Sequence, residues 1–409
     1  MPCTRILAMV MAGGAGSRLH PLTADRSKPA VPFGGRYRIV DFVLSNLLNS
    51  GIHSIYLLVQ YKSQCLIDHV EAAWSLSPIV SGQFVKIVPP QMREGPEWYL
   101  GTADAVFQNL NLIERQAPDV VAVFGADHIY RMDVRQMLAF HEARNADVTI
   151  SALPVPIELA TGFGVLAVDG SGRIESFQEK PSDPLPMPGD PERAYASMGN
   201  YLFRTEVLVE ALREGRARGE TDFGKHVLPR LLNSSRIFAY DFSGNRVPGV
   251  RDYEEPAYWR DVGTLDAYYA ASMDLLSKDP VFNLFNPRWP VRSDNYQGPV
   301  SRFVEGDVTN SLVGAGCLVK GGWIENSIIR SEVLIEEDVD IRDSIILDRT
   351  IIRKGARLHR AIVDTDNLIE AEARIGVCFG PADPMHHVTP SGITVVPQGR
   401  FSPENVRYF

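Results

Sequence analysis

A repeat in the C-terminal third of the chain restricts the folds that this sequence can adopt. Four apolar triplets recur at intervals of 16, 17 and 17 residues, at positions 311–313, 327–329, 344–346 and 361–363. Within a unit the aliphatic residues advance in steps of six, as in Ile346, Ile352 and Leu358. An α-helix cannot use this step, because six residues at about 100° each turn successive side chains onto different faces. A three-sided coil of short parallel strands can, since each side takes about six residues and points one aliphatic side chain inward.

We therefore expect a left-handed parallel β-helix over residues 301–409. The alternative is a set of ordinary antiparallel strands whose spacing coincides by chance, but nine aliphatic side chains stay in phase over three coils. Such a coil cannot bury its ends alone, so we expect it to dock on the rest of the chain or to oligomerise.

The first two thirds of the chain alternate apolar runs with segments of helical spacing. Strands are predicted at 6–11, 55–59 and 120–124, and helices at 39–49, 103–114 and 134–144. Continuous apolar strands separated by helices are typical of a parallel sheet covered on both faces. A turn over residues 169–172 predicts an antiparallel excursion within that pattern. The expected fold class is α/β, with a Rossmann-like, mostly parallel sheet followed by the β-helix.

The length of the chain requires more than one hydrophobic core. Single cores stop growing at roughly 250–300 residues, and this chain has 409. We expect an α/β domain over 1–276, a linker over 277–300, which contains four prolines, and the β-helix over 301–409.

Composition excludes several classes of function. The net charge of −9 lacks the basic footprint of nucleic-acid-binding proteins, so no DNA or RNA partner is expected. The four cysteines form no Cys-x-x-Cys pair, which argues against a disulfide framework or a structural zinc site. No signal peptide is recognisable, and no apolar stretch reaches the roughly 18 residues of a membrane span. We expect a soluble, cytoplasmic protein without a membrane partner.

The strongest local motif follows the first predicted strand. It consists of three glycines and two cations: Gly13, Gly14, Gly16, Arg18 and Lys28. Glycines let backbone N–H groups converge on an anion, and the cations supply the charge that phosphate binding needs. The loop is not a Walker A motif, which would end in Gly-Lys-Ser/Thr, nor a dinucleotide fingerprint, because Leu19 replaces the third glycine. A phosphate site is the favoured interpretation, and a tight structural turn is the alternative.

Two aspartates are candidates for a metal site. Asp127 follows a fully apolar predicted strand, where ligands of open α/β sheets lie, and its carboxylate suits Mg²⁺. Asp261 is a candidate second ligand. The alternatives are a helix cap or turn for Asp127 and pairing with Arg260 for Asp261. His128 is interpreted as a packed or capping residue, and the Glu-Lys-Pro sequence at 179–181 would by itself most often be a surface turn.

Taken together, these segments resemble the bacterial ADP-glucose pyrophosphorylases, also called glucose-1-phosphate adenylyltransferases. The resemblance covers nearly the whole chain. Its motifs are the glycine loop, residues 28–35, Trp98-Tyr99 with 101–105, 125–130, 163–165, 179–181, 197–199 and 258–263. The glycine loop is shared with other sugar nucleotidyltransferases, whereas the segments at 98–105 and 258–263 are more specific.

The resemblance implies a reaction and roles for individual residues. The adenylyl group of ATP would pass to α-D-glucose 1-phosphate, giving ADP-glucose and pyrophosphate in glycogen biosynthesis, with Arg18, Lys28 and Asp127 as catalytic residues. The nucleotide would be bound by Gly13, Gly14, Gly16, Arg18, Lys28, Gln60 and Gly101. Glucose 1-phosphate would be bound by Tyr99, Gly164, Glu179, Lys180, Ser197 and Tyr201. Asp127 and Asp261 would hold Mg²⁺, and the protein would be a homotetramer.

The sequence also departs from the family pattern, and other functions remain open. Gln91-Met92 stands where the family has two glutamines, and Arg36 stands where many relatives have an effector-binding lysine. Arg36 is therefore a possible site for a phosphate or sugar-phosphate effector, or else part of a solvated helix start. The rival functions are another nucleoside triphosphate:hexose-1-phosphate nucleotidyltransferase, a non-catalytic regulatory homologue, and a hexapeptide-repeat acyltransferase, for which His359 would be the candidate histidine.

Overall fold

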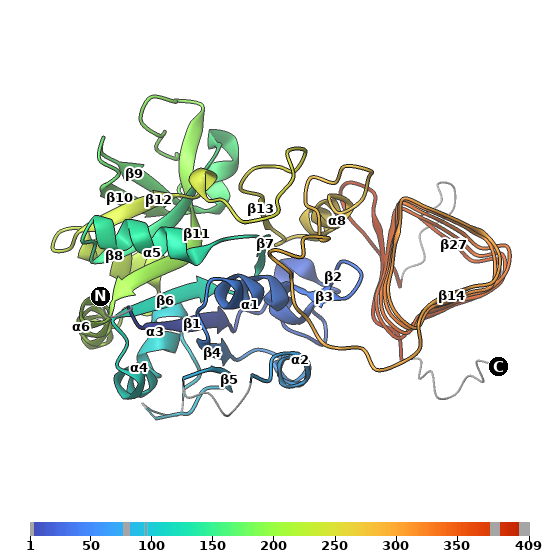
Figure 1. Cartoon of the computed structure of the whole chain (residues 1–409), viewed down its shortest axis with the longest axis horizontal. Helices are drawn as coiled ribbons and strands as arrows, with labels where there is room; N and C mark the ends of the chain where they lie inside the picture. Colours follow the sequence, from blue (N-terminus) through green and yellow to red (C-terminus); the bar gives the residue numbers. More distant parts are fainter. Residues whose placement is uncertain (1–3, 77–81, 94, 96, 377–384, 401–409) are drawn as a thin grey trace.

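The structure is a computed structural model that describes residues 4–76, 82–93, 95, 97–376 and 385–400. An α/β part and a triangular β-helix lie at opposite ends of the molecule (Figure 1). The α/β part is built on a nine-stranded sheet with the path β10-β9-β11-β6-β1-β4-β5, and with β8 beside β11 and β12 beside β8. Its strands are β1 (Ile6–Ala12), β4 (Ser54–Val59), β5 (Phe84–Val88), β6 (Val120–Gly125), β8 (Val148–Pro156), β9 (Gly164–Val168), β10 (Ile174–Glu179), β11 (Arg193–Arg204) and β12 (Ile237–Asp241).

Strand direction follows the sequence pattern. β5, β4, β1 and β6 are parallel neighbours, which confirms the parallel sheet that the apolar runs predict. β11 runs antiparallel to β6, β8 and β9, and β10 runs antiparallel to β9. The turn at 169–172 joins β9 to β10, so the predicted antiparallel excursion is also confirmed.

Helices cover both faces of the sheet (Figure 1). They are α1 (Ile39–Asn49), α2 (Gln64–Ala73), α3 (Thr102–Phe107), α4 (Leu110–Gln116), α5 (Val134–Ala143), α6 (Thr205–Ala217), α7 (Leu228–Leu231) and α8 (Leu265–Met273). Short 3₁₀ or π turns occur at Ser17–Leu19, Lys28–Ala30, Ile157–Gly162, Phe223–Val227 and Phe242–Gly244. No helix among the described residues is long and apolar enough to cross a membrane.

The prediction of one continuous helix over residues 103–114 is wrong. Residues 103–114 form two short helices, α3 and α4, because Asn109 has non-helical backbone angles of φ −116° and ψ 18°. The Asn109 side chain donates to the carbonyl of Ala105 and to the phenol oxygen of Tyr99. Such side-chain bonds compete with the helical backbone ladder, which is why periodicity alone missed the break.

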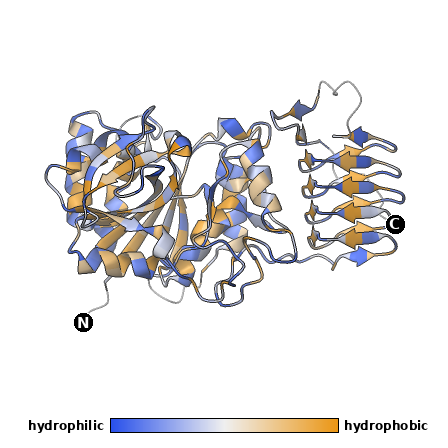
Figure 2. Cartoon of the chain, turned by 90° about the horizontal axis from the view of Figure 1, so that it is seen from above, coloured by the Kyte–Doolittle hydropathy of each residue, from blue (hydrophilic) through white to orange (hydrophobic). Residues whose placement is uncertain are grey.

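The repeat folds into three parallel sheets, one for each side of the β-helix. The first holds β14 (Arg302–Phe303), β17 (Leu318–Val319), β20 (Leu334–Ile335), β23 (Ile351–Ile352) and β26 (Leu368–Ile369). The second holds β15 (Asp307–Thr309), β18 (Trp323–Glu325), β21 (Asp340–Arg342), β24 (Arg357–His359) and β27 (Arg374–Ile375). The third holds β16 (Leu312–Val313), β19 (Ile328–Ile329), β22 (Ile345–Ile346), β25 (Ala361–Val363), β29 (Thr394–Val396) and β28 (His387–Val388). Figure 2 shows hydrophobic residues stacked from coil to coil, which confirms the six-residue interpretation of the repeat.

The β-helix docks on the α/β part through its third sheet. Ile328, Ile345 and Ile362 share a buried cluster with the aromatic residues of α8. Arg330 Nη1 donates to the carbonyls of Phe33, Gly34 and Tyr37, at 3.2, 3.0 and 2.8 Å. The expectation that the coil docks on the rest of the chain is confirmed.

The segment between the two parts is packed rather than free. Residues 277–300 contain no helix or strand, but Trp289 is buried. Asn49 donates to the carbonyl of Pro290, and the backbone N–H of Arg292 donates to Ser45 Oγ. This segment therefore lies along α1 on its way to the β-helix.

Candidate active site

The candidate site lies where the connections of the sheet change direction. From β1 the chain proceeds to β4 and β5 on one side, whereas β6 lies on the other side of β1. Ligands of open α/β sheets bind at such a point, outside the carboxyl ends of the strands. The glycine loop follows β1 and Asp127 follows β6, so the topology brings these two motifs together.

A cleft of about 560 Å³ opens at this point, within the size range of ligand sites. All of the residues predicted for nucleotide, sugar phosphate and metal line it. They are Gly13, Gly14, Gly16, Arg18, Lys28, Gln60, Tyr99, Gly101, Asp127, Gly164, Glu179, Lys180, Ser197, Tyr201 and Asp261.

The glycine loop packs closely against the segment that carries Lys28. Gly16 has φ +61°, and a Cβ atom there would lie 2.8 Å from Cβ of Lys28. Thr23 Oγ1 donates to the carbonyl of Gly16 at 3.0 Å and fixes the loop. Arg18, in the turn that follows, is exposed and lines the cleft. Glycine is required at position 16 by both backbone conformation and close approach.

Lys28 bridges the two predicted metal ligands. Its Nζ lies 3.0 Å from Asp127 Oδ2 and 2.9 Å from Asp261 Oδ1, and its side chain is buried. Burial alone would lower the pKa of Lys28, but the two carboxylates outweigh it and raise this pKa above its ordinary value. For Asp127, the loss of solvation on burial would raise the pKa, but electrostatic interactions with His128 and Lys28 hold it well below its ordinary range. The site is therefore charged at neutral pH.

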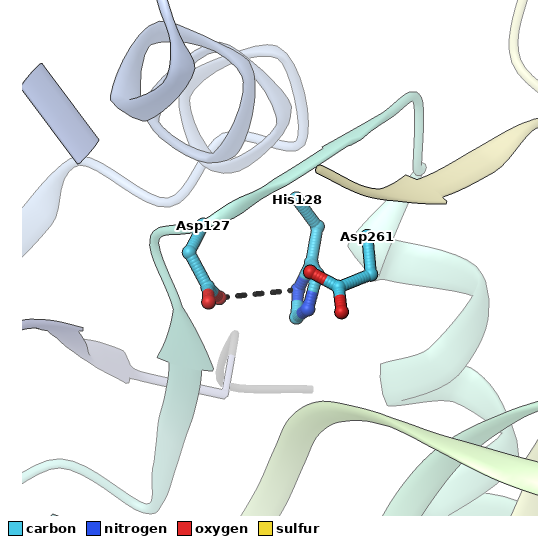
Figure 3. Close-up of side chains that lie close together, drawn as sticks. All are labelled: Asp127, His128 and Asp261. Carbon is cyan, nitrogen blue, oxygen red and sulfur yellow. Dashed lines mark ion pairs between the residues drawn. The ribbon is translucent and has the colours of Figure 1, made fainter. Parts of the chain in front are cut away.

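A two-stranded ribbon places Asp261 beside Asp127. β7 (His128–Tyr130) pairs antiparallel with β13 (Trp259–Asp261), with His128 opposite Asp261. Directly opposed residues of such a pair have neighbouring side chains. Figure 3 shows Asp127, His128 and Asp261 close together, and one ligand atom from each lies within 4.8 Å of the others.

The opposite end of the cleft is built around Glu179 and Lys180 at the end of β10. A Cβ atom on Gly164 would lie 2.7 Å from the Phe177 ring, and one on Gly224 would lie 2.7 Å from Glu179 Oε2. These glycines allow the β10 side chains to approach. Lys180 Nζ lies 3.5 Å from Glu179 and its side chain is 60 % exposed, so it is available to a ligand.

Gln60 and Tyr99 form a hydrogen-bonded unit in the lining of the cleft. Gln60 Oε1 accepts from the Tyr99 backbone N–H at 2.6 Å, and Gln60 Nε2 donates to the Tyr99 carbonyl at 3.2 Å. The Tyr99 hydroxyl is used inside the protein, where it accepts from Asn109 and donates to the carbonyl of Val88. Tyr99 therefore lines the cleft with atoms other than its hydroxyl oxygen.

Ser197 and Tyr201 line the cleft from β11. The pKa of Tyr201 is raised above its usual range, chiefly by burial, so the phenol stays neutral. Arg36, in contrast, lies outside the cleft, in a cavity between the α/β part and the β-helix, where it donates to the carbonyl of Asp294. The structure thus separates the possible effector residue from all the other predicted site residues.

Sequence reasoning missed several residues that line the cleft. Asp222, which accepts from Thr102 Oγ1 at 3.0 Å, lies in a loop that matches no short motif. His128, which from the sequence is interpreted as a packed or capping residue, also lines the cleft and lies close to both aspartates. The signal that could have found it is its position directly after Asp127 at the end of a buried strand.

Comparison with known proteins agrees with this arrangement. Residues 7–278 match the family model described as nucleotidyl transferase, and residues 300–396 match the GlmU-like C-terminal hexapeptide model. A glucose-1-phosphate adenylyltransferase of Thermodesulfovibrio yellowstonii is 52 % identical over 395 residues, covering 96 % of each chain. Proteins of the same name from Anaeromyxobacter sp. and Thermus thermophilus are 49 % and 48 % identical, each covering 96 % of this chain and 98 % of the relative. The chain belongs to the glucose-1-phosphate adenylyltransferase family of nucleotidyl transferases.

Proposed function

We propose that this chain transfers the adenylyl group of ATP to α-D-glucose 1-phosphate, giving ADP-glucose and pyrophosphate. The observation that carries the proposal is the cleft itself. The glycine loop, Lys28 and the Asp127–Asp261 pair lie at one end of the cleft, and Glu179 with Lys180 lies at the other. Family membership supports the identities of the two substrates.

In this reaction a phosphate oxygen of glucose 1-phosphate attacks the α-phosphorus of ATP. The bond from the α-phosphorus to the bridging oxygen breaks, and pyrophosphate leaves with that electron pair. Two anions must approach each other, so catalysis depends on positioning and on neutralising charge. Arg18 and Lys28 are placed for the triphosphate and Lys180 for the sugar phosphate, and no protein nucleophile is needed.

The donor set at Asp127 and Asp261 fits a divalent cation. Two carboxylates are hard oxygen ligands of the kind that Mg²⁺ prefers. Beside them, a buried nitrogen of His128 has no hydrogen-bond partner in the part of the chain that the structure describes. We propose Mg²⁺ as the resident ion. When bound it supplies positive charge next to the triphosphate, in addition to that of Lys28.

The test is pyrophosphate release with glucose 1-phosphate and ATP, UTP, GTP or dTTP. We expect ATP to give the highest kcat/KM, and glucose 1-phosphate to be preferred to mannose and galactose 1-phosphates. Equal use of the four nucleotides would contradict the ATP assignment and leave another nucleotidyltransferase. Absence of turnover with all of them would support a non-catalytic homologue.

We also propose that Arg36 contributes to a phosphate or sugar-phosphate effector site. The cavity at the junction gathers Arg36, Arg38, Arg330 and Arg349 within one space. Arg36→Ala should reduce the response of kcat/KM to inorganic phosphate and hexose phosphates without changing the unstimulated rate. An unchanged response would remove Arg36 from regulation.

Three further proposals accompany this function. We propose that the chain divides into a nucleotidyltransferase domain over 1–276, a linker over 277–300 and a β-helix domain over 301–409. A homotetramer is a prediction that rests on the family resemblance, and a cytoplasmic location is a prediction that rests on the scattered, unpaired pattern of cysteines.

A further inference from the structure

We infer that His128 is a third protein ligand of the divalent cation, through Nδ1, and that it suits the site to Mn²⁺ and Co²⁺ as well as to Mg²⁺. The inference rests on the proposed function, because that proposal places a cation near Asp127 and Asp261. The new element is a nitrogen ligand, which changes the ions that the site prefers.

The first argument is the hydrogen bonding of the imidazole. His128 Nδ1 is buried and has no hydrogen-bond partner within the described residues. The nearest carboxylate oxygen, Asp127 Oδ1, lies 3.5 Å away, which is longer than a normal hydrogen bond. Buried polar atoms in folded proteins nearly always have a partner, and one without a partner needs an explanation. A cation held between Nδ1 and the carboxylates would supply that partner.

The second argument is the position of Lys28. Its ammonium group engages Asp127 Oδ2 and Asp261 Oδ1. These two bonds do not involve Asp127 Oδ1, which is the carboxylate oxygen nearest to His128 Nδ1. A cation on the His128 side can therefore bind Asp127 without first displacing Lys28 from that carboxylate.

The third argument is the packing around the ring. The imidazole lies against Trp259, with ring centroids 4.9 Å apart. Gly125 and Gly199 border the ring, and a Cβ atom on Gly125 would lie 3.7 Å from Cε1 and 3.9 Å from Nδ1 of His128. The opposed register of β7 and β13 fixes His128 relative to Asp261. Besides the 3.5 Å approach of Nδ1 to Asp127 Oδ1, the ring is thus held by packing and strand register, as a preorganised ligand would be.

The chemical type of the ligands determines which ions the site binds most tightly. Mg²⁺ favours oxygen ligands and retains several waters, whereas imidazole nitrogen is a better ligand for first-row transition metals. Affinity for nitrogen-containing sites rises from Mn²⁺ towards Co²⁺. Loss of His128 should therefore weaken Co²⁺ and Mn²⁺ binding more than Mg²⁺ binding.

The test uses Mn²⁺ and Co²⁺ with the full chain and no substrates, so its result does not depend on which sugar or nucleotide reacts. Pulsed electron paramagnetic resonance of bound Mn²⁺ detects a directly coordinated nitrogen. We expect a nitrogen coupling in the unmodified protein and in His359→Phe, a control on the β-helix. We expect none in His128→Phe, which keeps an aromatic ring against Trp259.

Titration gives a second readout. Co²⁺ affinity should fall by about tenfold or more in His128→Phe, at least the scale on which ligand-supporting residues act, while Mg²⁺ affinity changes by less than about threefold. His128→Asn, which places an oxygen near the former Nδ1, keeps the test usable if the Phe variant does not fold, and should bind Mn²⁺ without nitrogen coupling. A nitrogen coupling that persists in both variants, bound Mn²⁺ without coupling in the unmodified protein, or failure to bind Mn²⁺ would overturn the inference.

Discussion

The coils of the β-helix are joined by contacts between residues about 17 positions apart, whereas the cleft is joined by contacts that span far more of the chain. Ser344, for example, accepts from the backbone of Ala361, and its own N–H donates to Ser327, in both cases at a separation of 17 residues. Lys28 reaches Asp127 across 99 residues and Asp261 across 233. A substitution that removes a contact in the β-helix should therefore affect mainly the neighbouring coils. A substitution that removes a contact in the cleft should affect groups from several distant segments at once.

This difference suggests that the two regions have separate roles. The β-helix contributes stability through repeated aliphatic packing, and the cleft contributes chemistry through charges brought together from distant parts of the chain. The two regions meet near Lys28, because Arg26, two residues earlier, donates to Asp364 and Thr365 of the β-helix at 2.9 and 3.0 Å. Four variants test how complete the division is.

The largest effect is expected for Asp127→Asn. Loss of this charge removes a partner of Lys28 and a proposed cation ligand, so kcat should fall by about 10²–10⁴-fold. Steady-state kinetics and circular dichroism measure activity and folding together. Asp68→Asn, an exposed substitution on α2, is the control and should retain full activity. Near-normal turnover of Asp127→Asn would remove this residue from the mechanism.

Ile346→Ala should reverse the pattern, with a large loss of stability and little change in kcat. The side chain is fully buried inside the coil, and deleting it should lower the free energy of unfolding by about 2–4 kcal/mol. Denaturant titration of the β-helix transition measures this. Val308→Ala, at a partly exposed site on the first coil, should cost less than about 0.5 kcal/mol. A fall in kcat comparable to that of Asp127→Asn would show that the two regions are not separate.

Lys180→Gln should affect one substrate selectively. Because Lys180 lies at the sugar end of the cleft, its loss should raise KM for glucose 1-phosphate by about tenfold or more, with KM for ATP nearly unchanged. Lys354→Gln, another exposed lysine paired with a carboxylate, is the matched control on the β-helix. Equal increases in both KM values would argue against the assignment of the two ends.

The smallest effect is expected for Arg26→Lys at the junction. Lysine keeps the charge but cannot reproduce the fork to Asp364, Thr365 and Gln398, so stability should fall by about 1 kcal/mol. Any reduction of kcat should stay below about threefold if the β-helix only supports the loop that carries Lys28. Arg342→Lys, on an exposed ion pair of β21, controls for the general effect of the substitution. A tenfold loss of kcat would make the junction part of the catalytic machinery.

The two regions also differ in how much of them the sequence predicts. The β-helix follows from the period alone, because the contacts between its coils repeat at a spacing that can be read along the chain. In the α/β part, the parallel strands and the position of Asp127 after β6 followed from apolar runs. From the sequence pattern alone, Asp261 stays one candidate ligand with a structural alternative. Its place beside Asp127 depends on a pairing of two strands whose partner residues lie 129 to 133 positions apart in the sequence.

Other details depend on tertiary contacts that no local pattern carries. The break between α3 and α4 arises because Asn109 bonds to Tyr99, and the same bond turns the Tyr99 hydroxyl away from the cleft. From the sequence, His128 is interpreted as a packed or capping residue, because a position directly after Asp127 does not by itself distinguish a ligand from a packing residue. Its position opposite Asp261 became evident only with the register of β7 and β13.

The central claim is that the cleft arranges charges around two substrates that react directly with each other. The stereochemistry of the transferred phosphorus tests it most directly. With ATP that carries a chiral phosphorothioate at the α-position, ³¹P nuclear magnetic resonance of the ADP-glucose product should show inversion of configuration, as a single in-line displacement requires. Retention of configuration would reveal a covalent adenylyl-protein intermediate, and would contradict a mechanism in which Arg18, Lys28, Lys180 and Asp127 act only by position and charge.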